Sequence, residues 1–182
     1  LPISLVSAFE TSFGRETNRE CVIIEIQSEG LTGYGECVAA RDPGYSYETA
    51  QTSIHVIKDF ISGLIKGKDI KDANDFQKRV EGIRGHHLAK AGVEMAIWDL
   101  LGKRENKSLK ELFGGVRDKV EVGVSIGIQE SKEALVKTTQ DYVNQGYARV
   151  KIKIKPGRDV EDAQAVRKHF PNLRLQVDAN SA

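Results

Sequence analysis

The first forty residues alternate between β-branched runs and turn residues. Cys21–Ile26 is rich in β-branched side chains, and Ser28–Gly30 is a turn signal that directs the chain toward Thr32–Glu36. This pattern predicts a hairpin or a small antiparallel meander.

Between Arg41 and Leu112 the apolar residues recur at helical spacing. The first predicted helix, for which Ser46 is the expected N-cap, has five apolar residues on one face: Ile54, Ile57, Ile61, Leu64 and Ile65. Asp72 is the expected N-cap of a second, shorter helix. A third helix has its own buried face: Val93, Ala96, Ile97, Leu100 and Leu101. Strands followed by helices predict an α+β fold for this part.

From Val120 onward the pattern becomes a strand, helix, strand, helix, strand succession. The predicted elements are a strand over Val120–Ile126, a helix over Ser131–Gln145 ended by Gly146, a strand over Ala148–Ile154, a helix over Asp159–Phe170 and a strand over Leu173–Asp178. A βαβαβ run implies parallel strands joined by right-handed crossovers.

Alternate side chains in these three strands are apolar and polar. The apolar set is expected to face the covering helices: Val120, Val122, Val124, Ile126, Val150, Ile152, Ile154, Leu175 and Val177. The other set is polar: Glu121, Gly123, Ser125, Arg149, Lys151, Lys153, Arg174, Gln176 and Asp178. A sheet buried on both faces would not tolerate the polar set. In a barrel, however, charged residues at the carboxyl ends of strands line the mouth of the active site.

Two lysines and one aspartate of the polar set have a chemical interpretation. Lys151 and Lys153 place two ammonium groups on the same side of one strand. Like charge and partial desolvation lower a lysine pKa, which is how a lysine becomes a general base near neutral pH. Asp178 ends the next strand, with Asn180 two residues on, and a carboxylate there is a candidate Mg²⁺ ligand. A solvated strand face and a turn-forming Asp would explain each feature alone, but their expected register favours catalysis.

Composition and charge narrow the classes of partner. The chain has 182 residues, 40% of them hydrophobic, and Lys+Arg 27 against Asp+Glu 26 give a formal net charge of +1. There is no broad electrostatic reason to expect nucleic acid or an anionic membrane as partner. No signal peptide and no bilayer-length apolar run is found. Cys21 and Cys37 lack metal-ligand spacing and are interpreted as reduced core thiols, which favours a cytoplasmic location.

Two other patterns carry no predicted site. His86 and His87 are adjacent, so their side chains diverge, and we expect them at a helix start or on the surface. Gly33–Glu36 and Gly114–Gly115 are glycine-rich but lack a strand-to-helix phosphate loop. Turn and hinge roles are expected for these glycines.

Longer segments resemble one enzyme family. Arg149–Gly157 followed by Leu175–Ala182 resembles the second- and third-strand signatures of the o-succinylbenzoate synthase / N-succinylamino acid racemase branch of the enolase superfamily. Val124–Ile128 resembles its first barrel strand. Ala89–Asp99 and Leu112–Gly115 resemble the helix and hinge of its capping domain. The resemblance extends from the first strand to the last residue.

The resemblance implies a role for particular residues. Lys153 would be the acid/base that removes the proton α to a carboxylate, and Lys151 a neighbouring catalytic cation that tunes it and holds substrate. Asp178 would be the first ligand of a Mg²⁺ that stabilises the enediolate. Ser125 and Asn180 would line the substrate site. The reaction would be dehydration to o-succinylbenzoate in menaquinone biosynthesis, or racemisation of an N-succinylamino acid, in which a second lysine returns the proton.

The resemblance also implies two domains and an incomplete barrel. Residues 1–115 would be the α+β capping domain, in which Thr11–Arg19 resembles the mobile loop that closes over substrate. Residues 116–182 would be the first three βα units of a (β/α)₈ TIM-type barrel, a fold that needs about 250 residues. The other two metal-ligand carboxylates and the opposing lysine would lie on five further strands. We therefore expect a truncated polypeptide or a split gene, inactive alone, with a homo-oligomer or a complementing C-terminal half as partner.

Three alternatives remain at this point. A dipeptide epimerase or a muconate cycloisomerase would use the same residues on another small carboxylate substrate. A non-catalytic fragment would serve as an assembly interface for another chain. An unrelated α/β module that binds a small molecule would require the polar strand positions to be accidental.

Overall fold

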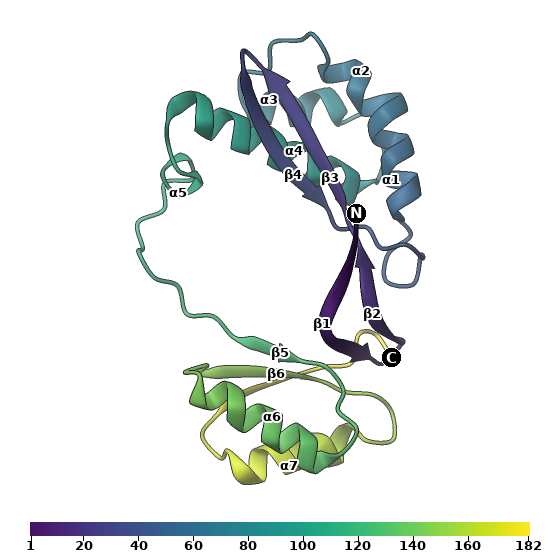
Figure 1. The fold of residues 1–182 in the computed structure, drawn as a ribbon, viewed down its shortest axis with the longest axis vertical. Coiled ribbons are helices and arrows are strands. Elements are labelled where there is room, and N and C mark those ends of the chain that lie inside the picture. Colours follow the sequence, from purple (N-terminus) through teal and green to yellow (C-terminus); the bar gives the residue numbers. More distant parts are fainter. The chain divides into compact units, whose positions relative to one another are not determined.

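The structure is a computed structural model that describes residues 1–182. The chain forms two compact units (Figure 1). The first unit comprises Leu1–Ser4 and Asn18–Val116, and the second comprises Leu5–Thr17 and Arg117–Ala182. The first two strands, β1 (Pro2–Thr11) and β2 (Gly14–Glu20), contribute residues to both units. The division at 115/116 expected from the sequence has a single boundary and stays a prediction about domains.

The first unit contains the hairpin expected from the sequence. Strands β3 (Val22–Ser28) and β4 (Leu31–Cys37) pair antiparallel, from Val22 opposite Cys37 to Ser28 opposite Leu31. Glu29 and Gly30 between them both have positive φ, as a tight two-residue turn requires.

Six helical segments follow the hairpin: α1 (Ala50–Val56), the π-helical turn η1 (Ile57–Ile61), α2 (Ser62–Ile65), α3 (Ala73–Val80), α4 (His87–Glu105) and α5 (Leu109–Leu112). The Asp72 cap of α3 is confirmed, since its side chain accepts the Asp75 N–H. The Ser46 cap is wrong. Thr49 caps α1 in a reciprocal capping box with Thr52, and Ser46 instead accepts the N–H of Glu48.

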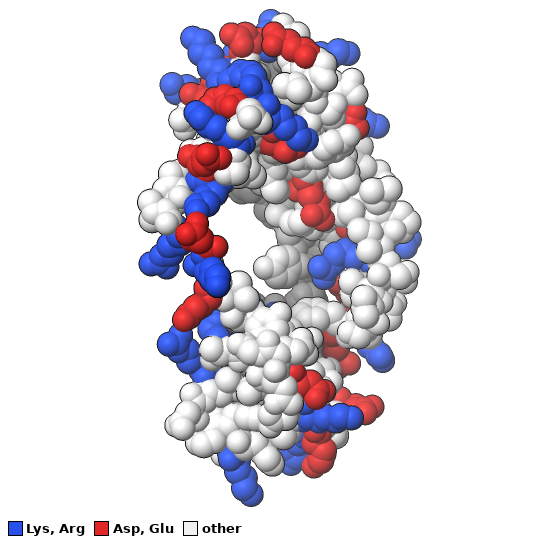
Figure 2. Space-filling view, turned by 60° about the vertical axis from the view of Figure 1, so that its left-hand side comes forward, with Lys and Arg blue, Asp and Glu red and all other residues white.

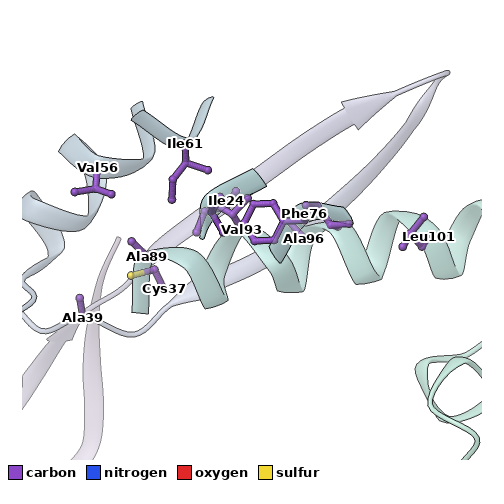
Figure 3. Packing of buried hydrophobic residues seen from close by; sticks show 12 residues of the cluster. Ile24, Cys37, Ala39, Val56, Ile61, Phe76, Ala89, Val93, Ala96 and Leu101 are labelled. Carbon is purple, nitrogen blue, oxygen red and sulfur yellow. The ribbon is translucent and has the colours of Figure 1, made fainter. Parts of the chain in front are cut away.

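The core of the first unit lies between the hairpin and α4. Figure 3 shows apolar side chains from β3, β4, α1, α3 and α4 gathered in one cluster. Its members are Ile24, Cys37, Ala39, Val56, Ile61, Phe76, Val80, Ala89, Val93, Ala96, Ile97 and Leu101. Most of the residues expected on the buried face of α4 are therefore in the core. Cys21 and Cys37 are free and buried, which confirms their interpretation as core thiols.

Two glycines allow β4 and α4 to pack in direct backbone contact. A Cβ atom at Gly33 would lie 2.2 Å from the Ala96 carbonyl oxygen, and one at Gly35 would lie 2.1 Å from that of Gly92. Both distances are far inside van der Waals contact, so only hydrogen fits. The turn role expected for these glycines is therefore wrong, because they lie within a strand and face a helix.

The start of α4 is held by a residue distant in sequence. His86, the N-cap residue, has a φ of 52° and makes no side-chain capping bond, so the expected position of the histidine pair at a helix start is confirmed. The Glu48 carboxylate instead accepts the N–H groups of Leu88 and Ala89 at 2.9 and 3.0 Å. Glu48 is only 2% exposed, and the helix dipole favours its charge.

We expect Glu48→Gln to lower the free energy of unfolding by about 1–3 kcal/mol, since one buried N–H loses its acceptor and faces an amide NH₂. Urea unfolding measures this change. Glu81→Gln, at an exposed position, is the matched control and should change stability by less than about 0.5 kcal/mol. Equal stabilities for the two variants would show that Glu48 does not cap α4.

Side chains of α4 also bind the free edge of β4. Asp99 accepts the Tyr34 N–H at 2.8 Å, and the Lys103 ammonium donates to the Thr32 carbonyl at 2.7 Å. Lys103 and Asp99 form an ion pair one helical turn apart. Two backbone groups of this edge are thus hydrogen-bonded without a neighbouring strand.

The second unit contains the predicted βαβαβ run. Strands β5 (Val124–Ile126), β6 (Arg149–Lys153) and β7 (Arg174–Asp178) form a parallel sheet in the order β5-β6-β7, with α6 (Lys132–Asn144) and α7 (Asp159–His169) as crossovers. Its core contains apolar residues of the sheet and of both helices: Ile126, Leu135, Val150, Ile152 and Val166. The expected orientation of the apolar strand positions is confirmed for the central residues.

The first strand is shorter than expected. Val120 and Val122 lie outside β5 and are 72% and 63% exposed. The pairing of β5 with β6 starts at Val124 opposite Val150, and β6 itself begins at Arg149. Residues before Val124 therefore lack a partner strand within this sheet.

The surfaces of both units carry mixed charge. In Figure 2, Lys and Arg side chains are interspersed with Asp and Glu side chains on the visible face. None of the helices combines the length and the apolar character that a bilayer crossing would require.

Candidate active site

The carboxyl ends of β6 and β7 bring the predicted catalytic residues together. Lys153 is the register partner of Asp178, as expected from the sequence. Two residues earlier on β6, Lys151 lies opposite Ser125 of β5 and Gln176 of β7. Parallel pairing alone thus places two lysines, a carboxylate and a hydroxyl on adjoining positions of one sheet face.

Asp178 binds both lysines through the same oxygen. Its Oδ2 lies 2.7 Å from the Lys153 Nζ and 3.0 Å from the Lys151 Nζ. Lys153 is 8% exposed, whereas the other two side chains remain partly accessible. The Lys153 ammonium, the Asn180 N–H and the Lys151 ammonium hold the pKa of the Asp178 carboxyl well below its usual range. The carboxylate therefore stays charged at neutral pH and offsets the repulsion between the two ammonium groups.

Asn180 and Ser125 occupy different positions around this group. The Asn180 N–H donates to Oδ1 of Asp178 at 3.0 Å, in a backbone conformation with a φ of 51°. The Asn180 side-chain oxygen is buried and has no hydrogen-bond partner. Ser125 is exposed on β5. Of the five predicted site residues, three are in direct ion-pair contact and Asn180 binds one of them through its backbone.

Residues around the turn between the paired strands β1 and β2 also contact these strand ends, and of them only Ser12 lies in a segment that the sequence linked to the site. The Ser12 hydroxyl donates to the Ala179 carbonyl at 2.6 Å, and the Ile128 N–H donates to the Glu10 carbonyl at 2.9 Å. The Phe9 ring centroid lies 6.0 Å from the Lys153 Nζ. Glu10 and Lys155 form an ion pair of 3.0 Å.

Most of the segment Thr11–Arg19, expected to be a loop, is strand, and its expected role in closing over substrate stays a prediction. Thr11 ends β1, Ser12 and Phe13 form the turn, and Gly14–Glu20 is β2. Residues that contact the strand ends come from Phe9–Ser12, mostly before the expected segment. Alternation of residues in β1 could have indicated a strand, but nothing in the sequence indicates its distant partners.

The polar residues of these strands lie at both ends of the sheet. Arg149 and Arg174 begin β6 and β7, and Arg174 pairs with Glu121 at 3.3 Å on the exposed side. These residues are at the amino ends of the strands, opposite the Lys153 end. The active-site mouth expected at the carboxyl ends of the strands concerns Lys151, Lys153 and Asp178, and that role stays a prediction.

Within residues 1–182 no three His, Cys, Asp or Glu side chains gather in the arrangement of a metal site. The assignment of Asp178 as a metal ligand stays a prediction.

A family comparison identifies the first part of the chain. The profile for the mandelate racemase / muconate lactonizing enzyme family, N-terminal domain, matches residues 3–114. The chain belongs to this family. Its fold is the N-terminal capping domain of the enolase superfamily followed by three parallel strands, as the resemblance implied.

Individual relatives agree on the branch. An o-succinylbenzoate synthase from Listeria innocua is 41% identical over 99% of this chain and 48% of its own length. An N-succinylamino acid racemase from Thermus thermophilus is 40% identical over 100% of the chain and 49% of its own length. The resemblance to the synthase/racemase branch is confirmed. The chain spans about half the length of the curated relatives it matches.

Solved structures give the same result. A member of the enolase superfamily from Listeria innocua superposes with a TM-score of 0.92 at 41% identity, over 100% of this chain and 49% of that one. A dipeptide epimerase from Enterococcus faecalis, complexed with Mg and the dipeptide L-Leu-L-Tyr, has a TM-score of 0.87 at 26% identity, over 99% of this chain and 51% of that one.

Proposed function

We propose that this chain forms the N-terminal part of an enzyme that removes a proton α to a carboxylate with the help of Mg²⁺. The observation that carries the proposal is the contact of Lys153 and Lys151 with one Asp178 oxygen at the carboxyl ends of β6 and β7. The family membership of the chain supports this interpretation.

Lys153 is the proposed acid/base. Its side chain is nearly buried, so a substrate carbon held beside it would exchange a proton with the amine rather than with bulk water. Lys151, more exposed and on the same strand face, is the proposed cation that holds the substrate carboxylate. The exposed Ser125 hydroxyl and the Asn180 amide are proposed substrate contacts.

Asp178 is the proposed Mg²⁺ ligand of this chain. A carboxylate that stays charged is a hard oxygen donor of the kind that Mg²⁺ selects. Bound Mg²⁺ would offset the negative charge that builds on the substrate carboxylate as the proton leaves. One carboxylate is a weak site alone, so we propose that the other ligands come from barrel strands outside residues 1–182.

The proposed substrates are those named for the relatives. Dehydration that yields o-succinylbenzoate and racemisation of an N-succinylamino acid would each begin with removal of the proton α to the carboxylate of its own substrate, followed by loss of water in the first case and return of a proton in the second. A dipeptide epimerase would need the same first step. The cytoplasmic location expected from the sequence stays a prediction.

The test uses the full-length protein in D₂O with an N-succinylamino acid and Mg²⁺, followed by proton NMR of the α position. We expect deuterium incorporation that chelation abolishes. Asp178→Asn should raise the Mg²⁺ concentration needed for half-maximal exchange by more than about 100-fold, because a neutral amide replaces a charged ligand.

Asp141→Asn, on the exposed side of α6, is the matched control and should leave the Mg²⁺ dependence unchanged. Wild-type protein that neither exchanges the α proton nor forms o-succinylbenzoate would refute the proposed function. An unchanged Mg²⁺ dependence in Asp178→Asn would refute the ligand assignment alone.

A further inference from the structure

The loop between β6 and α7, Ile154–Arg158, contains a third lysine with a different partner. Lys155 continues the alternation of Lys151 and Lys153, yet its ammonium lies 3.0 Å from Oε1 of Glu10 rather than on Asp178. Glu10 is the last residue but one of β1. The loop therefore binds a segment that precedes it by 145 residues.

The other end of the same loop carries Arg158, which makes two contacts. One guanidinium nitrogen is 3.1 Å from Asp162, whose side chain is only 3% exposed, and another donates to the Gln129 carbonyl at 3.0 Å. If Arg158 moved away, a buried carboxylate would lose its cation, which is costly. The ion pair with Asp162 therefore fixes the position of the Arg158 guanidinium. Through its hydrogen bond, the guanidinium in turn fixes the Gln129 peptide group.

The residue before Gln129 completes the connection. The Ile128 N–H donates to the Glu10 carbonyl at 2.9 Å, and the Gln129 side chain donates to the Gly127 carbonyl, which stiffens the same turn. Glu10 is thus held twice, through its carboxylate by Lys155 and through its carbonyl by Ile128. Phe9, the neighbour of Glu10, has its ring centroid 6.0 Å from the Lys153 Nζ.

We propose that the β6–α7 loop is a clasp that holds Phe9 over Lys153, with Glu10, Lys155 and Arg158 as positioning residues. This inference rests on the proposed function of Lys153. Closed, the clasp keeps the ring against the ammonium and limits the access of water to it. Open, it frees Phe9 and exposes Lys153. The Glu10–Lys155 pair is partly exposed and is the part of the clasp that opens.

The experiment compares charge variants of the full-length protein by amide hydrogen exchange and by steady-state kinetics. Lys155→Met and Glu10→Gln each remove one charge, and the double variant Glu10→Lys with Lys155→Glu exchanges the two charges. Exchange of the Ile128 amide measures how often its bond to Glu10 opens. Lys155→Arg keeps the charge and should behave as the wild type.

We expect the Ile128 amide to exchange about two- to fivefold faster in each single variant and to return toward the wild-type rate in the double variant. In each single variant, the rate of α-proton exchange at saturating substrate should fall by a similar factor, because Phe9 covers Lys153 less often. In the double variant this rate should return toward the wild-type value. The matched control is the surface ion pair of Lys132 and Glu161, 2.9 Å apart in the same unit. Lys132→Met and Glu161→Gln should leave both rates unchanged.

Unchanged exchange of the Ile128 amide in Lys155→Met would overturn the clasp. Faster Ile128 exchange with an unchanged rate of proton transfer would overturn the positioning role. Absence of proton transfer in the wild type would refute the proposed function, and the positioning role with it, while the amide measurement still decides whether the clasp exists.

Discussion

Replacement of Lys153 by arginine is expected to lower the rate of Mg²⁺-dependent α-proton exchange by about 10³-fold or more. Arginine keeps the positive charge beside Asp178, but its guanidinium is not deprotonated in proteins and cannot serve as a base. Loss of activity in this variant would therefore come from proton transfer and not from loss of the ion pair. Deuterium incorporation from D₂O, followed by NMR in the full-length protein, measures the rate.

Two further variants make this measurement specific. Lys153→Ala should lose the exchange as completely as the arginine variant, since both lack a base. Lys132→Ala, which removes an exposed lysine of the same unit, should keep the wild-type rate. If Lys153→Arg exchanged protons at the wild-type rate, another group would have to be the base.

Gly35→Ala is expected to lower the free energy of unfolding by about 3 kcal/mol. Its Cβ would lie 2.1 Å from the Gly92 carbonyl oxygen, and this atom belongs to the backbone of α4 and cannot rotate away. Strand and helix must move apart, which loosens the packing of the whole first core. Urea denaturation monitored by far-UV circular dichroism gives the change in stability.

The same chain offers a control for the loss of glycine itself. Gly63, on the exposed side of α2, has open space around its Cα and no positive φ. Gly63→Ala should therefore stabilise the protein by about 0.5–1 kcal/mol through helix propensity and a less flexible unfolded chain. Similar stabilities for the two variants would contradict the close packing of β4 on α4.

Elements with a regular local pattern could be predicted from the sequence. The strand–helix succession from β5 to β7 predicts adjacent parallel strands, and the alternation in β6 and β7 predicts that Lys153 and Asp178 share one face of the sheet. Val120 and Val122 continue the same alternation, yet they lie outside the sheet. A residue joins a sheet only where a neighbouring strand extends alongside it, and the pairing with β6 starts at Val124. Alternation reports which face a residue would occupy and not whether a neighbour is present.

Contacts between distant segments account for most of what the sequence did not predict. Glu48 caps a helix that begins about forty residues later, and Glu10 binds Lys155 across most of the chain. Nothing near these residues indicates such partners. Gly33 and Gly35 did carry a signal, since two glycines at alternate positions of a predicted strand indicate a close backbone approach on one face.

The binding of Asp99 and Lys103 to the free edge of β4 has a consequence for the behaviour of the protein in solution. An open strand edge is a template for another chain, and this is a route to aggregation. Here the Tyr34 N–H and the Thr32 carbonyl are already hydrogen-bonded, and an incoming strand would have to displace an ion pair to reach them. The small two-stranded sheet therefore resists self-association along this edge, and α4 protects it as well as packing on it.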